Sequence, residues 1–225
     1  MRSLPKNFMI ARALRAVNVA SLFSGGKDSA YATYIAQQTA WTVKHLVTVV
    51  PVEGSMMFHH PNVGLAHLLA EAMGIPHVSV GSGEGEGEEL TALGKALRRL
   101  KDVEGVVTGA IASDYQWSRI NGVCHSLGLK CFSPLWRRDP GMLLWDLLAA
   151  GFEVVFVGAS AEGFDRSWLG RRLDEGAIRD LIRLRKMHGV NLSGEGGEYE
   201  TLALSGPNFA KRLVIERARV DWKRD

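Results

Sequence analysis

Residues 24–29 read Ser-Gly-Gly-Lys-Asp-Ser and could bind a phosphate group. Two adjacent glycines lack a β-carbon, so their backbone N–H groups can approach an anion closely. Lys27 adds a positive charge, and the flanking serines add hydroxyl donors. The Walker pattern of the common phosphate loop fails twice, because it requires Gly where Ser21 stands and Ser or Thr where Asp28 stands. The stretch therefore predicts a phosphate loop of another kind.

The carboxylate of Asp28 is unexpected beside a phosphate group, because two negative charges repel each other. A bound Mg²⁺ would remove the conflict, since this ion prefers carboxylate and phosphate oxygens. The alternative is a tight glycine turn in which Asp28 only caps the next helix. The position of the loop after an expected strand favours a ligand site, because open parallel sheets bind ligands beyond the carboxyl ends of their strands.

A second polar stretch, MFHHPN at residues 57–62, also follows an expected strand. It would place His59 and Asn62 near the edge of the sheet that carries the glycine loop. Histidine titrates near neutral pH and can contact a substrate, but a surface histidine without a role fits the spacing equally well.

A third stretch, GAIASDYQWSR at residues 109–119, follows another expected strand. Gly109 permits a close approach, and Asp114 is expected to cap the helix that follows. Arg119 lies one turn beyond Tyr115 on the same helical face, where its guanidinium could meet a phosphate group. The alternative is a capped helix with polar surface residues.

A fourth stretch, GEGGEYETL at residues 194–202, crowds Glu195, Glu198 and Glu200 around Tyr199. If the chain is extended from Glu198 onward, Glu198 and Glu200 share one face and Tyr199 points to the other. Three carboxylates held close together repel one another unless a cation lies between them. The alternative is an exposed acidic turn.

Hydrophobic patterning predicts that strands and helices alternate through the first half of the chain. This alternation is typical of a parallel sheet with helices on both faces. The expected elements are a strand at 17–23, a helix at 29–38, a strand at 43–50, a helix at 63–73, a strand at 77–80, a helix at 89–100, a strand at 103–108, a helix ending near 128 and a strand at 129–134.

The second half is expected to mix helices and strands. Asp139 as N-cap and Pro140 as the first helical residue introduce a helix that continues over 142–150. A strand is expected at 152–157 and a helix at 175–188, and β-branched residues predict strands from Thr201 to Trp222. The predicted fold class is α/β, a doubly wound, Rossmann-like parallel sheet with a smaller mixed α+β C-terminal domain.

Composition excludes several other classes of protein. The 225 residues carry a formal charge of +3, which is too small to indicate nucleic acid as a partner. No apolar run approaches the roughly 18 to 20 residues that span a bilayer. Cys124 and Cys131 have the spacing of neither a redox pair nor a zinc site, which indicates free thiols in a reducing cytosol.

The hexapeptide SGGKDS resembles the SGGxDS pyrophosphate (PP) loop of the ATP pyrophosphatase enzymes, which cleave ATP between its α and β phosphates. That cleavage explains the missing Walker pattern. SGGKDS, MFHHPN, GAIASDYQWSR, WLGRR at residues 168–172 and GEGGEYETL, in this order, closely resemble the diphthine-ammonia ligase (diphthamide synthase) family. The resemblance runs from Val17 to Phe209, and GEGGEYET is its most specific part.

The resemblance implies ATP-dependent amidation of the diphthine carboxylate with ammonia through an acyl-adenylate, giving diphthamide, AMP and pyrophosphate. ATP and Mg²⁺ are the implied cofactors. The implied partners are ammonia and translation elongation factor 2 bearing diphthine, in the cytoplasm of an archaeal cell. A membrane or nucleic-acid partner is not expected, and a homodimer stays open.

The resemblance also implies an adenine nucleotide alpha hydrolase-like fold, while composition and the pattern of elements divide the chain. The expected parts are a basic N-terminal extension at 1–16, a PP-loop ATP-binding domain at 17–130 and a C-terminal substrate-recognition domain at 131–225.

The implied site residues fall into four sets. The catalytic set is Lys27, Asp28, Glu195 and Glu198. The ATP-binding set is Ser24, Gly25, Gly26, Lys27, Asp28, Ser29, Gly109 and Arg119. The substrate-binding set is His59, Asn62, Asp114, Tyr115, Glu198, Tyr199, Glu200 and Thr201, and Asp28 is the metal ligand.

The quaternary ammonium group of diphthine cannot donate an N–H hydrogen bond, so aromatic faces and carboxylates are expected to bind it. The candidates for such a cage are Tyr199, Tyr115 and Trp117, with Glu198 or Glu200 nearby. The sequence leaves open whether a glutamate of this stretch, Glu195 or Glu198, positions ammonia instead.

Two other functions stay open at this point. An enzyme of the same superfamily could adenylate a tRNA base, although the two cysteines lack the spacing of its sulfur-transferring members. A non-catalytic ATP-binding sensor would need the loop but would have no use for the clustered glutamates.

Overall fold

The computed structural model describes residues 16–50, 63–83 and 87–222. The expected substrate-binding residues His59 and Asn62 lie outside these ranges. Within them, no helix combines the length and the apolar character needed to cross a membrane.

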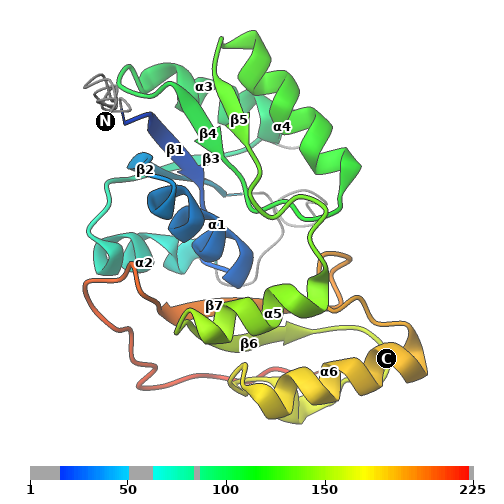
Figure 1. Ribbon diagram of the computed structural model, residues 1–225. Coiled ribbons are helices and arrows are strands. Elements are labelled where there is room, and N and C mark those ends of the chain that lie inside the picture. Colours follow the sequence, from blue (N-terminus) through cyan, green and yellow to red (C-terminus); the bar gives the residue numbers. More distant parts are fainter. Residues whose placement is uncertain (1–15, 51–62, 84–86, 223–225) are drawn as a thin grey trace, which may run out of the picture.

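The first half of the chain forms a parallel five-stranded sheet (Figure 1). Its strands are β1 (Asn18–Leu22), β2 (Thr42–Val50), β3 (His77–Gly81), β4 (Gly105–Val107) and β5 (Lys130–Phe132). The spatial order β3-β2-β1-β4-β5 makes β1 and β4 neighbours at the centre, where the direction of winding reverses. Such a reversal opens a crevice beyond the carboxyl ends of the two strands, which is the usual ligand site of this architecture.

Helices cover both faces of the sheet, as the predicted doubly wound fold requires. They are α1 (Lys27–Gln38), the 3₁₀ turn η1 (Val63–Leu65) with α2 (Ala66–Met73), α3 (Glu88–Arg99) and α4 (Asp114–Ser126). One apolar cluster contains buried residues of α1 and α2, and a second contains those of α3 and α4. The central strands are buried on both faces, as is typical of a parallel sheet covered by helices. The α/β fold class is confirmed.

The second half adds a smaller mixed unit, drawn in Figure 1 below α1 and α2. It contains α5 (Pro140–Ala149), β6 (Glu153–Ala159), the 3₁₀ turn η2 (Arg166–Trp168), α6 (Glu175–His188) and β7 (Tyr199–Ser205). Strands β6 and β7 pair antiparallel. The expected helix signals are confirmed, because Asp139 caps α5 ahead of Pro140 and Gly189 ends α6 in the left-handed conformation.

The two halves share one hydrophobic core. The cluster around α1 and α2 continues through buried residues of α5, β6, α6 and β7. Phe152 contributes to this continuity, because its ring packs edge-on against Tyr31 and Tyr34 of α1 at centroid distances of 5.7 and 5.8 Å. The expected domain boundary near residue 130 stays a prediction.

The prediction of strands from Thr201 to Trp222 is wrong beyond Ser205. Residues 206–222 form no strand, and the β-formers Val214 and Ile215 are 68% and 45% exposed. Gly206 and Pro207 interrupt β7, and the backbone that follows bonds to α2 instead, with Ala210 and Lys211 N–H groups donating to the Ala72 carbonyl. β-branched residues form a strand only where a neighbouring strand and a core receive them.

Candidate active site

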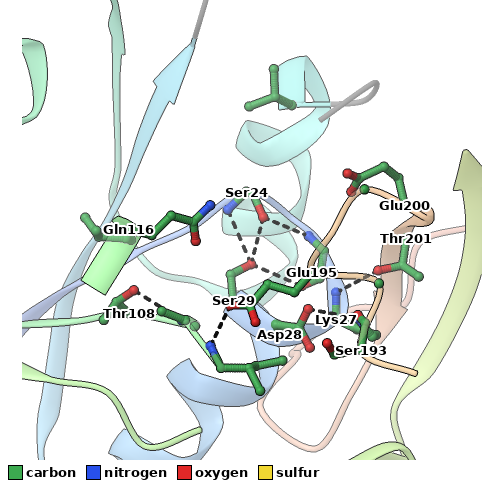
Figure 2. A pocket seen from close by; sticks show the side chains of 18 of the residues that line it. Ser24, Lys27, Asp28, Ser29, Thr108, Gln116, Ser193, Glu195, Glu200 and Thr201 are labelled. Carbon is green, nitrogen blue, oxygen red and sulfur yellow. Dashed lines mark hydrogen bonds and ion pairs between the residues drawn. The ribbon is translucent and has the colours of Figure 1, made fainter. Parts of the chain in front are cut away.

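A cavity of about 660 Å³ lies beyond the carboxyl ends of β1 and β4 (Figure 2). Three segments supply most of its polar lining: the loop at 24–29, the loop at 108–111 and the segment 193–201. The first two follow neighbouring strands, whereas the third leads into β7 of the second half. The cavity therefore lies where the winding of the sheet reverses, and the segment 193–201 of the second half closes it.

The loop at 24–29, called the PP-loop from here on, holds its shape through its own serines. The Ser24 N–H donates to Ser29 Oγ at 3.3 Å, and Ser29 Oγ donates to the Gly26 carbonyl at 3.1 Å. Gly25 has φ of +85°, a conformation that favours glycine. Gly26 is the N-cap of α1, so Asp28 lies in the first turn and is not the cap. The positive end of α1 thus points into the cavity, which suits an anion.

Lys27 is fixed by its surroundings and is only 3% exposed. Its ammonium donates to Asp28 Oδ2 at 2.8 Å and to the Ser193 carbonyl, and it lies 5.0 Å from the centroid of the Tyr199 ring. Burial alone would lower the pKa of Lys27, but the Asp28 carboxylate and the other negative groups around it raise the pKa above its ordinary value. Lys27 is therefore charged, and it joins the PP-loop to the segment 193–201.

Two further hydrogen bonds join the PP-loop to β7. The Lys27 N–H donates to Thr201 Oγ1 at 3.2 Å, and the Ala203 N–H donates to the Gly25 carbonyl at 2.9 Å. Thr201, an expected substrate-binding residue, lines the cavity, and its hydroxyl contacts the start of α1.

Glu195 contacts the loop that follows β4. Its Oε1 accepts the N–H groups of Ile111 and Ser113 at 2.9 and 3.3 Å, and its Oε2 accepts that of Ala112 at 2.7 Å. The Ser113 side chain accepts the Gln116 N–H, so Ser113 caps α4, and the expectation that Asp114 does so is wrong by one residue.

The three glutamates have different surroundings. Glu195 binds backbone N–H groups, and Glu198 Oε1 accepts the Asn191 N–H at 3.2 Å. Strand β7 begins only at Tyr199, so Glu198 precedes it and is absent from the lining of the cavity, where Glu200 is present. Backbone donors thus separate carboxylates that the sequence places close together.

The expected aromatic cage is not assembled in the structure. Tyr199 is 2% exposed, and its hydroxyl donates to the Leu192 carbonyl at 2.6 Å. Burial raises the pKa of Tyr199 to about 12. Tyr115 and Trp117, which are 41% and 36% exposed, lie on α4 outside the lining of the cavity.

Arg119 does not line the cavity either. Its guanidinium stacks 3.5 Å from the centroid of the Tyr115 ring, which confirms that the two share a helical face. The side chains of α4 that reach the cavity are Gln116 and Ile120, one turn apart on another face. The sequence names Gln116 in a polar stretch, but only the orientation of the helix singles it out.

Gly109 permits a close approach of two backbones. A β-carbon at this position would lie 2.9 Å from both Asp28 C and Ser29 N, which is too close for a real contact. The loop after β4 is therefore packed directly on the PP-loop.

The WLGRR stretch lies outside the lining of the cavity. Trp168 is buried, and the Arg171 guanidinium stacks on its ring at 4.5 Å and bonds to Asp180. The stretch therefore packs within the second half.

Sequence reasoning missed Ser193, which is 2% exposed and accepts the Lys27 ammonium through its carbonyl. A backbone acceptor leaves no signal in the side-chain pattern.

The expectation of free thiols is confirmed, since Cys124 is buried and Cys131 is half-buried and neither forms a disulfide.

Two family models match the chain. The model described as diphthamide synthase N-terminal domain matches residues 17–131, and the model described as diphthamide synthase C-terminal domain matches residues 139–225. Together they account for most of the sequence, including every polar stretch that lines the cavity.

Curated proteins named diphthine-ammonia ligase are similar over the same length. The protein from Bos taurus is 34% identical over 227 residues, which cover 91% of this chain and 85% of the relative. The protein from Homo sapiens is 32% identical with the same coverage, 91% and 85%. These relatives are eukaryotic and lend no support to the expected archaeal origin.

A solved structure from Methanocaldococcus jannaschii, titled as a predicted subunit of tRNA methyltransferase, is 17% identical with a TM-score of 0.47. The match covers 85% of this chain and 98% of that one.

Proposed function

The chain belongs to the diphthamide synthase family, and from this premise we propose how its cavity carries out the ATP-dependent amidation of diphthine to diphthamide. The observation that carries the proposal is the PP-loop, whose residues Ser24, Gly26 and Ser29 line a cavity of about 660 Å³ at the positive end of α1. These groups suit the leaving pyrophosphate of ATP.

Amidation requires activation, because a carboxylate is a poor acyl donor. Its oxygen leaves badly and its charge repels a nucleophile. In the proposed sequence the diphthine carboxylate attacks the α-phosphorus of ATP, and the bond to pyrophosphate breaks. Ammonia then attacks the acyl carbon, displaces AMP and loses one proton to solvent as the amide forms. The chain contributes by binding the leaving pyrophosphate at the PP-loop, where fixed donors stabilise the developing negative charge.

Lys27 acts in this proposal as a fixed positive charge beneath the PP-loop. Its ammonium is already bound by Asp28 and Ser193, so it stabilises the loop and contributes its electric field without moving. Its place in the site is therefore set before the nucleotide arrives.

The residues present fit a magnesium ion as part of the proposal. Asp28 and Glu200 both line the cavity, and Mg²⁺ typically binds one or two carboxylates together with substrate phosphates. When bound, the ion would neutralise charge on the phosphates. Asp28 is the residue that would hold it beside the PP-loop, since Asp28 lies in the first turn of α1.

The finer parts of the proposal concern partners and place. Translation elongation factor 2 is the proposed diphthine-bearing protein, and the cytoplasm is the proposed compartment. A homodimer is a further expectation, which equilibrium sedimentation of the purified chain tests.

The proposal is tested by incubating the chain with ATP, ammonium and diphthine-bearing elongation factor 2. The expected products are AMP, pyrophosphate and a factor whose mass changes from acid to amide. Asp28→Ala is expected to abolish AMP release while the circular dichroism spectrum stays that of the wild type.

Three controls separate the proposal from its alternatives. Elongation factor without diphthine should yield no AMP, and tRNA should not replace it. Formation of ADP in place of AMP would contradict cleavage between the α and β phosphates. Full AMP release by Asp28→Ala would contradict the role of the PP-loop.

A further inference from the structure

Glu195 joins the segment 193–201 to the loop that follows β4. Its carboxylate accepts three backbone N–H groups of the loop at 111–113, at 2.9, 2.7 and 3.3 Å. Glu195, Ile111 and the residues on either side of Glu195 all line the cavity. The contact therefore spans the wall of the cavity, and its partners are 82 to 84 positions apart in the sequence.

The same segment is held on its other side by the PP-loop. Ser193 accepts the Lys27 ammonium, and Thr201 accepts the Lys27 N–H at 3.2 Å. The segment 193–201 is thus tied to the end of β1 through Lys27 and to the end of β4 through Glu195. The relative position of the two strand-end loops depends on these ties.

The carboxylate of Glu195 forms its hydrogen bonds with the loop at 111–113. Both of its oxygens accept N–H groups of this loop. A carboxylate with both oxygens bonded to one loop holds that loop in place. The loop it holds is fixed from the other side as well, since the Arg137 N–H donates to the Ile111 carbonyl at 2.7 Å.

We infer that Glu195 is a positioning residue that sets the separation of the PP-loop and the loop at 111–113, and hence the fit of ATP and the diphthine carboxylate. The inference rests on the proposed function for its substrates, but the contact itself is independent of it. It revises the expectation that Glu195 takes part directly in the chemistry.

The test compares Glu195→Gln with Glu175→Gln. Glutamine keeps the length of the side chain but presents one NH₂ group, which cannot accept an N–H bond. Glu175 is the matched control, because it is 67% exposed on α6 and pairs across one helical turn with Arg179. Initial rates are measured over ATP concentration, diphthine substrate concentration and pH.

The expected result for Glu195→Gln is a KM for ATP and for the diphthine substrate raised about 10-fold to 100-fold, since loss of a hydrogen bond to a charged group has an effect of this size. The pH profile of kcat should keep its shape, and Glu175→Gln should match the wild type. A KM within twofold of the wild type would overturn the inference. So would a kcat lowered by about 100-fold or more together with loss of one limb of the pH profile, because this result marks a general base.

A measurement on the wild type keeps the inference testable if Glu195→Gln does not fold. Native-state hydrogen exchange should find the N–H groups of 111–113 protected, and exchange at the rate of an unstructured peptide would overturn the inference. The wild-type assay also separates the two failures. If the wild type releases no AMP with the diphthine substrate, the proposed function fails, while hydrogen exchange still decides whether Glu195 holds this loop.

Discussion

Replacing Lys27 by Met should destabilise the protein as well as impair its site. The ammonium is buried beside the Asp28 carboxylate at 2.8 Å, with the Ser193 carbonyl as a further acceptor. Methionine fills similar space but leaves a carboxylate without its cation and a buried carbonyl without its donor.

The magnitude follows from the exposure of the partners. Removing one partner of a fully buried ion pair costs about 3 to 5 kcal/mol. Asp28 is 28% exposed, so water recovers part of this loss, and we expect a reduction of about 3 kcal/mol in the free energy of unfolding. For a chain of this length, that change lowers the melting temperature by about 6 to 12 °C.

Urea unfolding followed by circular dichroism measures this change. Lys211→Met is the matched control, since Lys211 and its partner Glu71 are 70% and 71% exposed and the pair should contribute less than about 1 kcal/mol. In the background of Lys27→Met, Asp28→Asn should recover at least about 1 kcal/mol, because it removes the uncompensated charge. If Lys27→Met is as stable as the wild type within about 0.5 kcal/mol, the ion pair is not what fixes Lys27, and the reasoning is refuted.

Three further predictions address other parts of the structure. Gly109→Ala should lower kcat/KM for ATP by about 100-fold, because its β-carbon would lie 2.9 Å from PP-loop backbone atoms. A β-carbon at Gly122 meets nothing within 4 Å, so the control Gly122→Ala should keep full activity. Equal rates for the two variants would contradict the close approach at Gly109. Burial lowers the pKa of His77, so the neutral imidazole stabilises the fold fully above its ordinary pKa of 6.5, and this stabilisation is lost as the pH falls. In urea titrations, His77→Gln should therefore lose less stability than the wild type between pH 7 and pH 5. Burial raises the pKa of Tyr199 from 10.0 to about 12, so the neutral phenol stabilises the fold fully below pH 10, and this stabilisation is lost toward pH 12. Tyr199→Phe should lose less stability than the wild type over this range, and the same loss in both proteins would contradict the prediction.

The sequence was sufficient for the sheet and the PP-loop because both depend on local patterns. Apolar runs of strand length, each followed by a helical period, specify a doubly wound sheet, and two glycines after the first strand specify the turn. The strands expected after Ser205 failed because side-chain type does not say whether a neighbouring strand is available. Placing the cap of α4 at Asp114 and not at Ser113 is an error of one residue between two side chains that cap equally well.

The contacts within the site could not be predicted, because they join residues far apart in sequence through backbone groups. Every residue has an N–H and a carbonyl, so nothing in the sequence marks Ser193 as the acceptor for Lys27. The sequence likewise does not mark the three N–H groups that Glu195 binds. Without these partners, the stretch around Glu195 suggested a cluster of carboxylates that repel one another.

The contact of β7 with the PP-loop has a consequence for the order in which the protein matures during synthesis. A ribosome releases the PP-loop early, but the groups that hold it, Thr201 Oγ1 and the Ala203 N–H, are added about three quarters of a chain later. A nascent chain that ends before β7 therefore has the glycine turn and α1 but not their support. Nucleotide binding should consequently require β7, and a chain truncated before Tyr199 should bind ATP more weakly than the full chain.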